Sequence, residues 1–202
     1  FTAACLGALQ DEGNSLARAG VVAGVSVGSI IGAALATNTR IADLLDRLQD
    51  TDVVEHHSAM TNMFRTLQMY RGKRKSLFST RAIEEILQET FGDRPVQVKE
   101  YTAVAGDALD LKQVEFTVPQ NSSIPLPIVL ASCAILGAYP AIQLQQPGKE
   151  QRWYIDGGFS NAFPMKKMKQ FMQSADARVM SLHAAKPWLG RIPDIKMTKF
   201  SV

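Results

Sequence analysis

Residues 19–37 decide the fold, and they read Ala-Gly-Val-Val-Ala-Gly-Val-Ser-Val-Gly-Ser-Ile-Ile-Gly-Ala-Ala-Leu-Ala-Thr. The first part, from Ala19 to Ser26, is a short apolar run of the kind that forms a strand buried at the centre of a sheet. From Val27 to about Thr37 the pattern becomes helical. This order of strand, sharp turn and helix places Ser26 at the turn itself.

Ser26 also lies within a Gly-x-Ser-x-Gly sequence that runs from Gly24 to Gly28. A nucleophilic serine must project from a strained strand-to-helix turn, and the flanking glycines avoid clashes between side chains and the close backbone. The hydroxyl then lies near the N-terminus of the helix, where N–H groups and the helix dipole favour a developing negative charge. We therefore interpret Ser26 as a candidate nucleophile.

A second motif follows a predicted strand over residues 152–155, where the chain continues as Asp156-Gly157-Gly158. An Asp-Gly-Gly loop is also a common solvent-exposed turn. Beside a serine elbow, however, a carboxylate held by backbone donors at a strand end can accept the serine proton as a general base. We therefore interpret Asp156 as the base of a Ser26–Asp156 pair.

The two motifs, in this order, resemble the patatin-like phospholipase family, whose catalytic device is a Ser–Asp dyad without histidine. Three further stretches are similar to the family: Phe1 to Gly13, Ala131 to Pro140, and Asn161 to Pro164. The resemblance implies an α/β, three-layer fold with a central mixed, mainly parallel sheet and helices on both faces. It also implies a phospholipase A-type lipid acyl hydrolase, which cleaves fatty-acyl esters through an acyl-serine intermediate.

The oxyanion hole of that family comes from a glycine-rich loop just before its first helix, and this sequence begins, at Phe1, after that loop. We expect residues 1–202 to form a single catalytic domain that lacks the N-terminal strand and the glycine-rich loop. The N–H of Val27, directly after the nucleophile, is expected to supply one oxyanion donor. Losing one such donor lowers a rate by about 100- to 1,000-fold.

Two other classes of function stay open. Ser26, Asp156 and His183 occur in the chain order of an α/β-hydrolase triad, which would make the protein an esterase. A non-catalytic lipid- or protein-binding module on the same fold is the other alternative. Ser132 has no flanking glycines, and we interpret it as a packed small residue and not as a nucleophile.

The composition is that of a globular protein, because 46% of the 202 residues are hydrophobic and 20% are charged. No apolar run reaches the ~18–20 residues of a membrane-spanning helix, so we expect a soluble or peripheral protein. A net charge of +3 is too weak to predict nucleic-acid binding. Cys5 and Cys133 are expected to be buried free thiols, and no residue spacing indicates a metal or a cofactor.

A basic loop is either a solvated turn, which is the commoner case, or a contact with anionic lipid head groups, to which each residue would contribute ~1 kcal/mol near such a surface. It consists of Arg71, Lys73, Arg74 and Lys75. The expected partners are a phospholipid or other acyl-lipid substrate and a peripheral membrane surface. The resemblance extends to secreted bacterial members that need a host activator, so a protein activator and a cytoplasmic, peripheral-membrane or secreted location all stay open.

Periodicity predicts the remaining elements. Helices are expected over residues 1–12, 41–48, 56–70 and 125–135, and another between a Thr80 cap and Gly92. Strands are expected over residues 101–106, 113–118 and 178–182.

Overall fold

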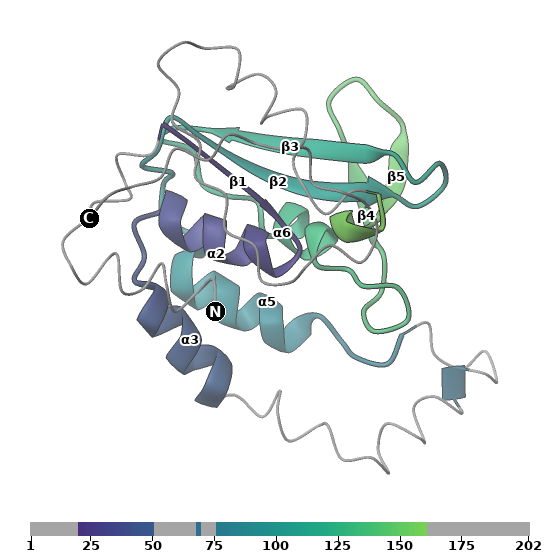
Figure 1. The fold of residues 1–202 in the computed structure, drawn as a ribbon, viewed down its shortest axis with the longest axis horizontal. Coiled ribbons are helices and arrows are strands. Elements are labelled where there is room, and N and C mark those ends of the chain that lie inside the picture. The colour runs from purple at the N-terminus through teal and green to yellow at the C-terminus, as the bar shows by residue number, and fades with distance from the viewer. Residues whose placement is uncertain (1–19, 51–67, 70–75, 161–202) are drawn as a thin grey trace, which may run out of the picture.

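The computed structural model describes residues 20–50, 68–69 and 76–160, which form a five-stranded sheet with helices beneath it (Figure 1). The strands are β1 (Val21–Val25), β2 (Glu100–Asp107), β3 (Gln113–Pro119), β4 (Ile142–Gln145) and β5 (Gln151–Asp156). The helices are α2 (Val27–Ala36), α3 (Ile41–Asp50), α5 (Arg81–Leu87) and α6 (Leu126–Ser132), with a π-helical turn at Gln88–Gly92 and a 3₁₀ turn at Gly157–Phe159. No helix within these ranges has the length and apolar character needed to cross a membrane.

Strand β2 organises the sheet because three strands pair with it. Strand β3 pairs antiparallel with one edge of β2, from Glu100 to Gly106. Parallel β1 and antiparallel β5 must therefore share the other edge, where β1 ends opposite Val104 and β5 ends opposite Ala105. These two strands run toward each other, and their carboxyl ends meet at adjacent residues of β2. Strand β4 pairs with the outer edge of β5.

The expectation of a mainly parallel sheet is wrong for the described strands, in which only the β1–β2 pairing is parallel. Short connections explain two of the three antiparallel pairings, β2–β3 and β4–β5. Residues 108–112 join β2 to β3 and residues 146–150 join β4 to β5. Links this short can only return the chain antiparallel, since a parallel neighbour needs a crossover of about a dozen residues or more.

Helix α2 packs directly beneath β1 and β2, and its residues from Ser29 to Ala36 are buried. Its small side chains permit a close approach: a Cβ on Gly32 would lie 3.2 Å from Val22 and 3.4 Å from Tyr101. The buried Tyr101 hydroxyl donates to the carbonyl of Ser29 at 2.8 Å and so ties helix to sheet. Figure 1 places α3 and α5 below α2, and α6 contacts α2, β2 and β5.

The described residues include no helices on the opposite face of the sheet, which the three-layer arrangement requires. That arrangement therefore stays a prediction. The mixed α/β character of the fold, with parallel and antiparallel strands in one sheet, is confirmed.

Most predicted elements within the described ranges are confirmed to within a few residues. Thr80 occupies the N-cap position of α5 as predicted, but its side chain makes no cap hydrogen bond. The Ser79 hydroxyl instead accepts from the Arg81 N–H at 3.2 Å. Strand β4 was not predicted. The helix over 1–12 and the strand over 178–182 lie outside the described residues, as does the helix over 56–70 except for the helical residues 68–69.

The glycine at position 24 is required by the packing of α2 on β1. A Cβ on Gly24 would lie 2.2 Å from the carbonyl oxygen of Gly28 and 2.6 Å from the Cα of Ser29. Backbone atoms of a packed helix cannot move aside, so the steric reason predicted from the motif is confirmed here. A Cβ on Gly28 would meet no described atom within 4 Å, and the described structure gives no steric reason for glycine there.

These two glycines of one motif provide a matched test. Gly24→Ala is expected to lower the free energy of unfolding by about 1–3 kcal/mol, because the new methyl group overpacks the strand–helix contact. Gly28→Ala is expected to leave it unchanged or raise it by up to ~1 kcal/mol, since alanine favours the helix. Urea unfolding of both variants measures the difference, and equal losses would contradict the role assigned to Gly24.

Candidate active site

Ser26 lies between the end of β1 and the start of α2 in a strained conformation, with φ 55° and ψ −134°. Such a conformation costs on the order of 1–3 kcal/mol in a residue with a side chain and persists only where the surroundings impose it. Ser26 occupies the N-cap position of α2, yet its hydroxyl makes no cap hydrogen bond. It donates instead to Oδ2 of Asp156 at 2.5 Å.

Asp156 is the last residue of β5 and is only 4% exposed. While Oδ2 accepts from Ser26, Oδ1 accepts from the backbone N–H of Gly158 at 2.7 Å. Its own N–H donates to the carbonyl of Ala134 at 2.9 Å. Both carboxylate oxygens and the backbone are thus held, which fixes the orientation of the side chain toward Ser26.

The two glycines after Asp156 let the loop turn against the sheet. A Cβ on Gly157 would lie 2.4 Å from the carbonyl oxygen of Val104, the β2 residue opposite the end of β1. A Cβ on Gly158 would lie 3.0 Å from Oδ1 of Asp156. Larger residues would push the loop away from β2 and carry the carboxylate with it.

Burial raises the pKa of Asp156 above its ordinary value, and the hydrogen bonds from Ser26 and Gly158 oppose this only in part. A carboxylate with a raised pKa is a better proton acceptor than an exposed one. Burial also raises the pKa of Cys133 to about 12, so this partly buried free thiol stays protonated at neutral pH and is not a nucleophile.

Val27 is the first residue of α2, so its N–H is one of the helix donors without an intrahelical acceptor. The described residues offer it no other acceptor, and its side chain is 59% exposed. The N–H therefore lies beside Ser26 at the positive end of the α2 dipole, in a position suited to an oxyanion.

Ser132, at the end of α6, was interpreted from sequence as a packed residue, and it is fully buried. It also accepts a hydrogen bond from the N–H of Ser26 at 3.0 Å and donates one to the carbonyl of Val104 at 2.5 Å. Sequence reasoning missed these bonds. The available signal was a hydroxyl inside the apolar run 126–134, because a buried hydroxyl must find partners.

The other predicted site residues lie outside the described residues: Arg71, Lys73, Arg74, Lys75 and His183. Within the described ranges, no group of three or more His, Cys, Asp or Glu side chains is arranged to hold a metal ion.

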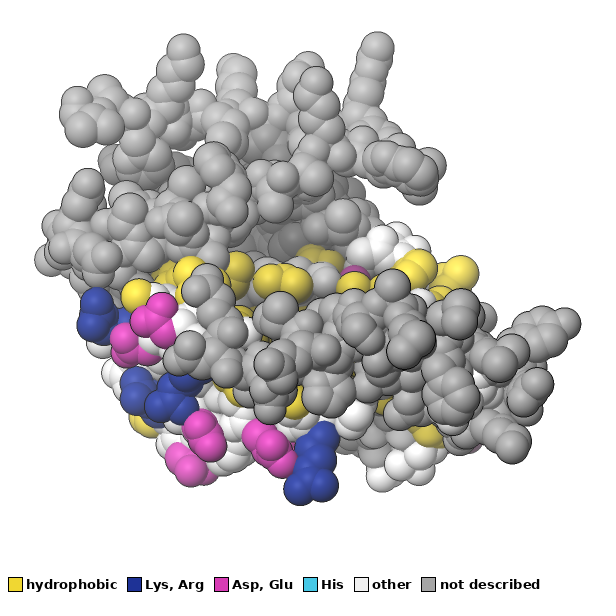
Figure 2. Space-filling model, turned by 90° about the horizontal axis from the view of Figure 1, so that it is seen from below, with side chains coloured by type: hydrophobic (Ala, Val, Ile, Leu, Met, Phe, Trp, Pro, Cys, Tyr) yellow, Lys and Arg dark blue, Asp and Glu magenta, His cyan; other side chains and the backbone are white. Residues whose placement is uncertain are grey.

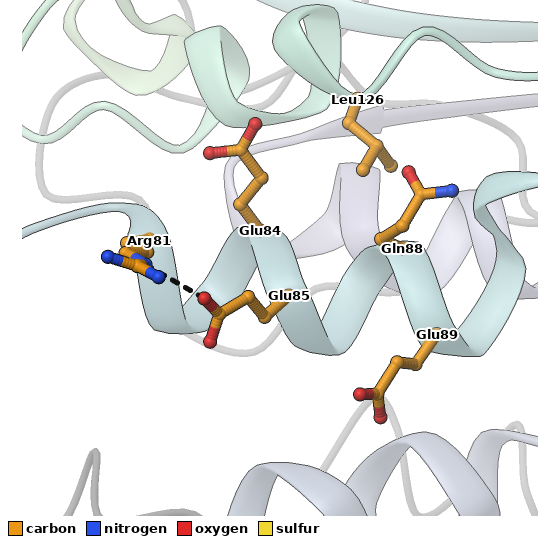
Figure 3. A pocket seen from close by; sticks show the side chains of 6 residues that line it. All are labelled: Arg81, Glu84, Glu85, Gln88, Glu89 and Leu126. Carbon is orange, nitrogen blue, oxygen red and sulfur yellow. Dashed lines mark hydrogen bonds and ion pairs between the residues drawn. The ribbon is translucent and has the colours of Figure 1, made fainter.

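A wide groove of about 560 Å³ lies along α5 (Figure 3). Neither dyad residue lines it. Its walls are Arg81, Glu84, Glu85, Gln88, Glu89 and Leu126. The Arg81–Glu85 ion pair within it is solvent-exposed, with an Nε to Oε1 distance of 2.8 Å. Because these groups include no nucleophile held against a base, we place the candidate active site at Ser26 and Asp156.

Comparison with protein families gives a match between residues 1–168 and the model of the family described as patatin-like phospholipase. The matched range contains both dyad residues. A comparison with curated proteins finds no match.

The raised pKa of Asp156 has a consequence for stability. The folded state holds the proton of this carboxyl more tightly than the unfolded state, so ionised Asp156 destabilises the fold at pH values above its folded pKa. Asp156→Asn keeps an oxygen for Gly158 but removes the charge. We expect this variant to have a higher free energy of unfolding than wild type at pH 7.

The gain should shrink as the pH falls through the raised pKa toward the ordinary value of an aspartate, because the wild-type carboxyl then becomes neutral as well. Urea unfolding at pH 7 and at about pH 4 compares the two proteins. If Asp156→Asn is less stable than wild type at pH 7, the charge of Asp156 does not destabilise the folded state.

Proposed function

The chain belongs to the patatin-like phospholipase family, and from this premise we propose that it hydrolyses fatty-acyl esters of phospholipids or neutral lipids with Ser26 and Asp156. Membership of the family suggests lipid acyl hydrolase activity. The observation that carries the finer proposal is the hydrogen bond of 2.5 Å between the Ser26 hydroxyl and Oδ2 of Asp156. It joins a strained elbow serine directly to a buried carboxylate.

In the first step, Oγ of Ser26 attacks the acyl carbonyl while its proton passes to Oδ2 of Asp156. The carbonyl oxygen becomes an oxyanion next to the start of α2. The N–H of Val27 and the helix dipole stabilise this charge, together with any donors that other segments supply. The oxyanion then collapses, and the protonated Asp156 gives its proton to the departing alcohol oxygen, which leaves an acyl-serine.

In the second step, Asp156, again ionised, takes a proton from a water molecule that attacks the acyl-serine. Collapse of the second oxyanion releases the fatty acid, and the proton returns from Asp156 to Oγ of Ser26. The same carboxyl thus acts as base and acid in each half-reaction. The raised pKa of Asp156 suits this double role. It reduces the difference in pKa between this carboxyl and the hydroxyl groups and water with which it exchanges protons.

The direct contact between Ser26 and Asp156 supports a dyad over the triad with His183. In a triad the histidine lies between the serine and the carboxylate, and each neighbour bonds to a different ring nitrogen. Here the carboxylate itself accepts from the serine hydroxyl. His183 lies outside the described residues, so the triad is retained as an alternative for the experiment to decide.

A membrane surface is the proposed source of the substrate. Four exposed apolar side chains come from the three segments that meet at the dyad: Val27, Ile135, Leu136 and Phe159. Ile135 and Leu136 follow the Ala134 carbonyl that accepts from Asp156. Seen from below, the molecule shows a row of hydrophobic side chains beside a cluster of charged ones, without identifying the residues (Figure 2). The exposure of the four named residues alone carries the membrane proposal. Apolar groups around a nucleophile can enter the acyl region of a lipid surface.

Labelling with a fluorophosphonate probe tests the proposed function in the full natural protein. Wild type should label, whereas Ser26→Ala and Asp156→Asn should lose labelling by about 1,000-fold or more, since each lacks one half of the reacting pair. His183→Ala should label like wild type. Labelled protein is quantified by in-gel fluorescence with lipid vesicles and with cell extract, which would supply a protein activator.

Loss of labelling in His183→Ala would replace the dyad with the triad esterase. Absence of labelling in wild type under every condition would favour a non-catalytic lipid- or protein-binding module.

Sedimentation with vesicles tests the membrane proposal. The double variant Leu136→Glu, Phe159→Glu is expected to bind anionic vesicles at least about 10-fold more weakly than wild type, since two charges must be desolvated near the acyl region. Leu109→Glu is the matched control, because Leu109 is 80% exposed but lies in the turn beyond the end of β2. Equal binding by the double variant and the control would remove the apolar residues around the dyad as the membrane contact.

A further inference from the structure

We propose that Ser132 is a positioning residue, whose hydroxyl holds the strained elbow so that the Ser26 hydroxyl meets Asp156. This inference rests on the proposed function of the dyad. It assigns no chemical step to Ser132 itself.

The hydroxyl of Ser132 bridges the two strands at the point where their pairing ends. The last paired residues of β1 and β2 are Val25 and Val104, after which the chain leaves the sheet at Ser26. The Ser132 hydroxyl accepts from the N–H of Ser26 at 3.0 Å and donates to the carbonyl of Val104 at 2.5 Å. A side chain thus continues the link between β1 and β2 through the elbow residue.

The directions of these bonds exclude Ser132 as a second nucleophile. A hydroxyl has one proton to donate, and that of Ser132 is directed to the Val104 carbonyl. A carbonyl oxygen cannot act as a general base at neutral pH. The same donation leaves a lone pair of the hydroxyl facing the N–H of Ser26, which is the arrangement that holds a backbone in place.

The last residue of α6 and the two residues after it form a short segment, 132–134, that contacts the backbone of both dyad residues. The Ser132 hydroxyl accepts a hydrogen bond from the N–H of Ser26. Two residues later, the carbonyl of Ala134 accepts one from the N–H of Asp156 at 2.9 Å. Helix α6 packs against α2, β2 and β5, so this segment stands on a rigid support. This segment therefore fixes the end of β1 and the end of β5 relative to each other. Among the described residues, the bond from the Ser26 N–H to the Ser132 hydroxyl is the only one that a side chain of this segment makes with Ser26.

The fully buried position of Ser132 makes the bonds hard to replace. A strained backbone conformation such as that of Ser26 persists only while its surroundings over-determine it. With alanine at position 132, no described group takes over the N–H of Ser26, and the elbow can relax away from Asp156. A displacement of about 1 Å in a reacting group can lower a rate by about 100-fold.

The test compares Ser132→Ala with wild type and with Thr90→Val in the full natural protein. Thr90 is 3% exposed, and its hydroxyl donates to the Ile86 carbonyl at 2.6 Å, so this control also loses a buried hydroxyl but lies far from the elbow in the chain. Two quantities are measured: kcat and KM for a soluble short-chain ester, and the hydrogen-exchange rate of the Ser26 amide. If Ser132→Ala does not fold, Ser132→Cys serves instead, because a thiol is a much weaker donor and acceptor.

Ser132→Ala should lower kcat by about 10- to 100-fold with little change in KM, and the Ser26 amide should exchange faster. Thr90→Val should change neither quantity. A wild-type kcat in Ser132→Ala, or an unchanged exchange rate, would overturn the inference. If wild type itself hydrolyses no ester, the proposed function fails, and the exchange comparison still decides whether Ser132 holds the elbow.

Discussion

One edge of β2 carries two strands that run toward each other, and the rest of the site depends on this arrangement. Strand β1 ends opposite Val104 and strand β5 ends opposite Ala105. At a strand end the backbone can turn out of the sheet while the residues before it are still held by the ladder. Two such ends at adjacent positions bring Ser26 and Asp156 into hydrogen-bond contact without a long flexible loop.

The meeting of two strand ends leaves little room for side chains. Gly24 lets α2 turn back over β1, and Gly157 lets the loop after β5 lie against the Val104 carbonyl. The same crowding leaves Ser26 strained and Asp156 buried. Both features oppose folding stability, and both favour a serine hydroxyl directed at a basic carboxylate. This is the usual relation between stability and activity at functional sites.

Local sequence signals predicted the two halves of the candidate site, because an elbow serine and an Asp-Gly-Gly turn are each written in a few consecutive residues. The way they meet could not be predicted locally, since it depends on β5 pairing antiparallel to β2 beyond the end of β1. The bonds of Ser132 were missed for the same reason: their partners lie 106 and 28 residues away in the sequence. Strand β4 could have been found, because partly buried Ile142 and Leu144 alternate with exposed Gln143 and Gln145.

The two dyad residues are 130 positions apart in the chain. A ribosome that adds ~5–20 residues per second needs roughly 7–26 s to synthesise this interval. Until β5 leaves the ribosome, Ser26 has no Asp156 carboxylate to contact. The apolar helix α2 likewise has to wait for β2 and α6, which pack against it and come later in the sequence. A nascent chain therefore cannot assemble the Ser26–Asp156 pair before Asp156 has been synthesised, so the candidate site stays incomplete throughout this interval.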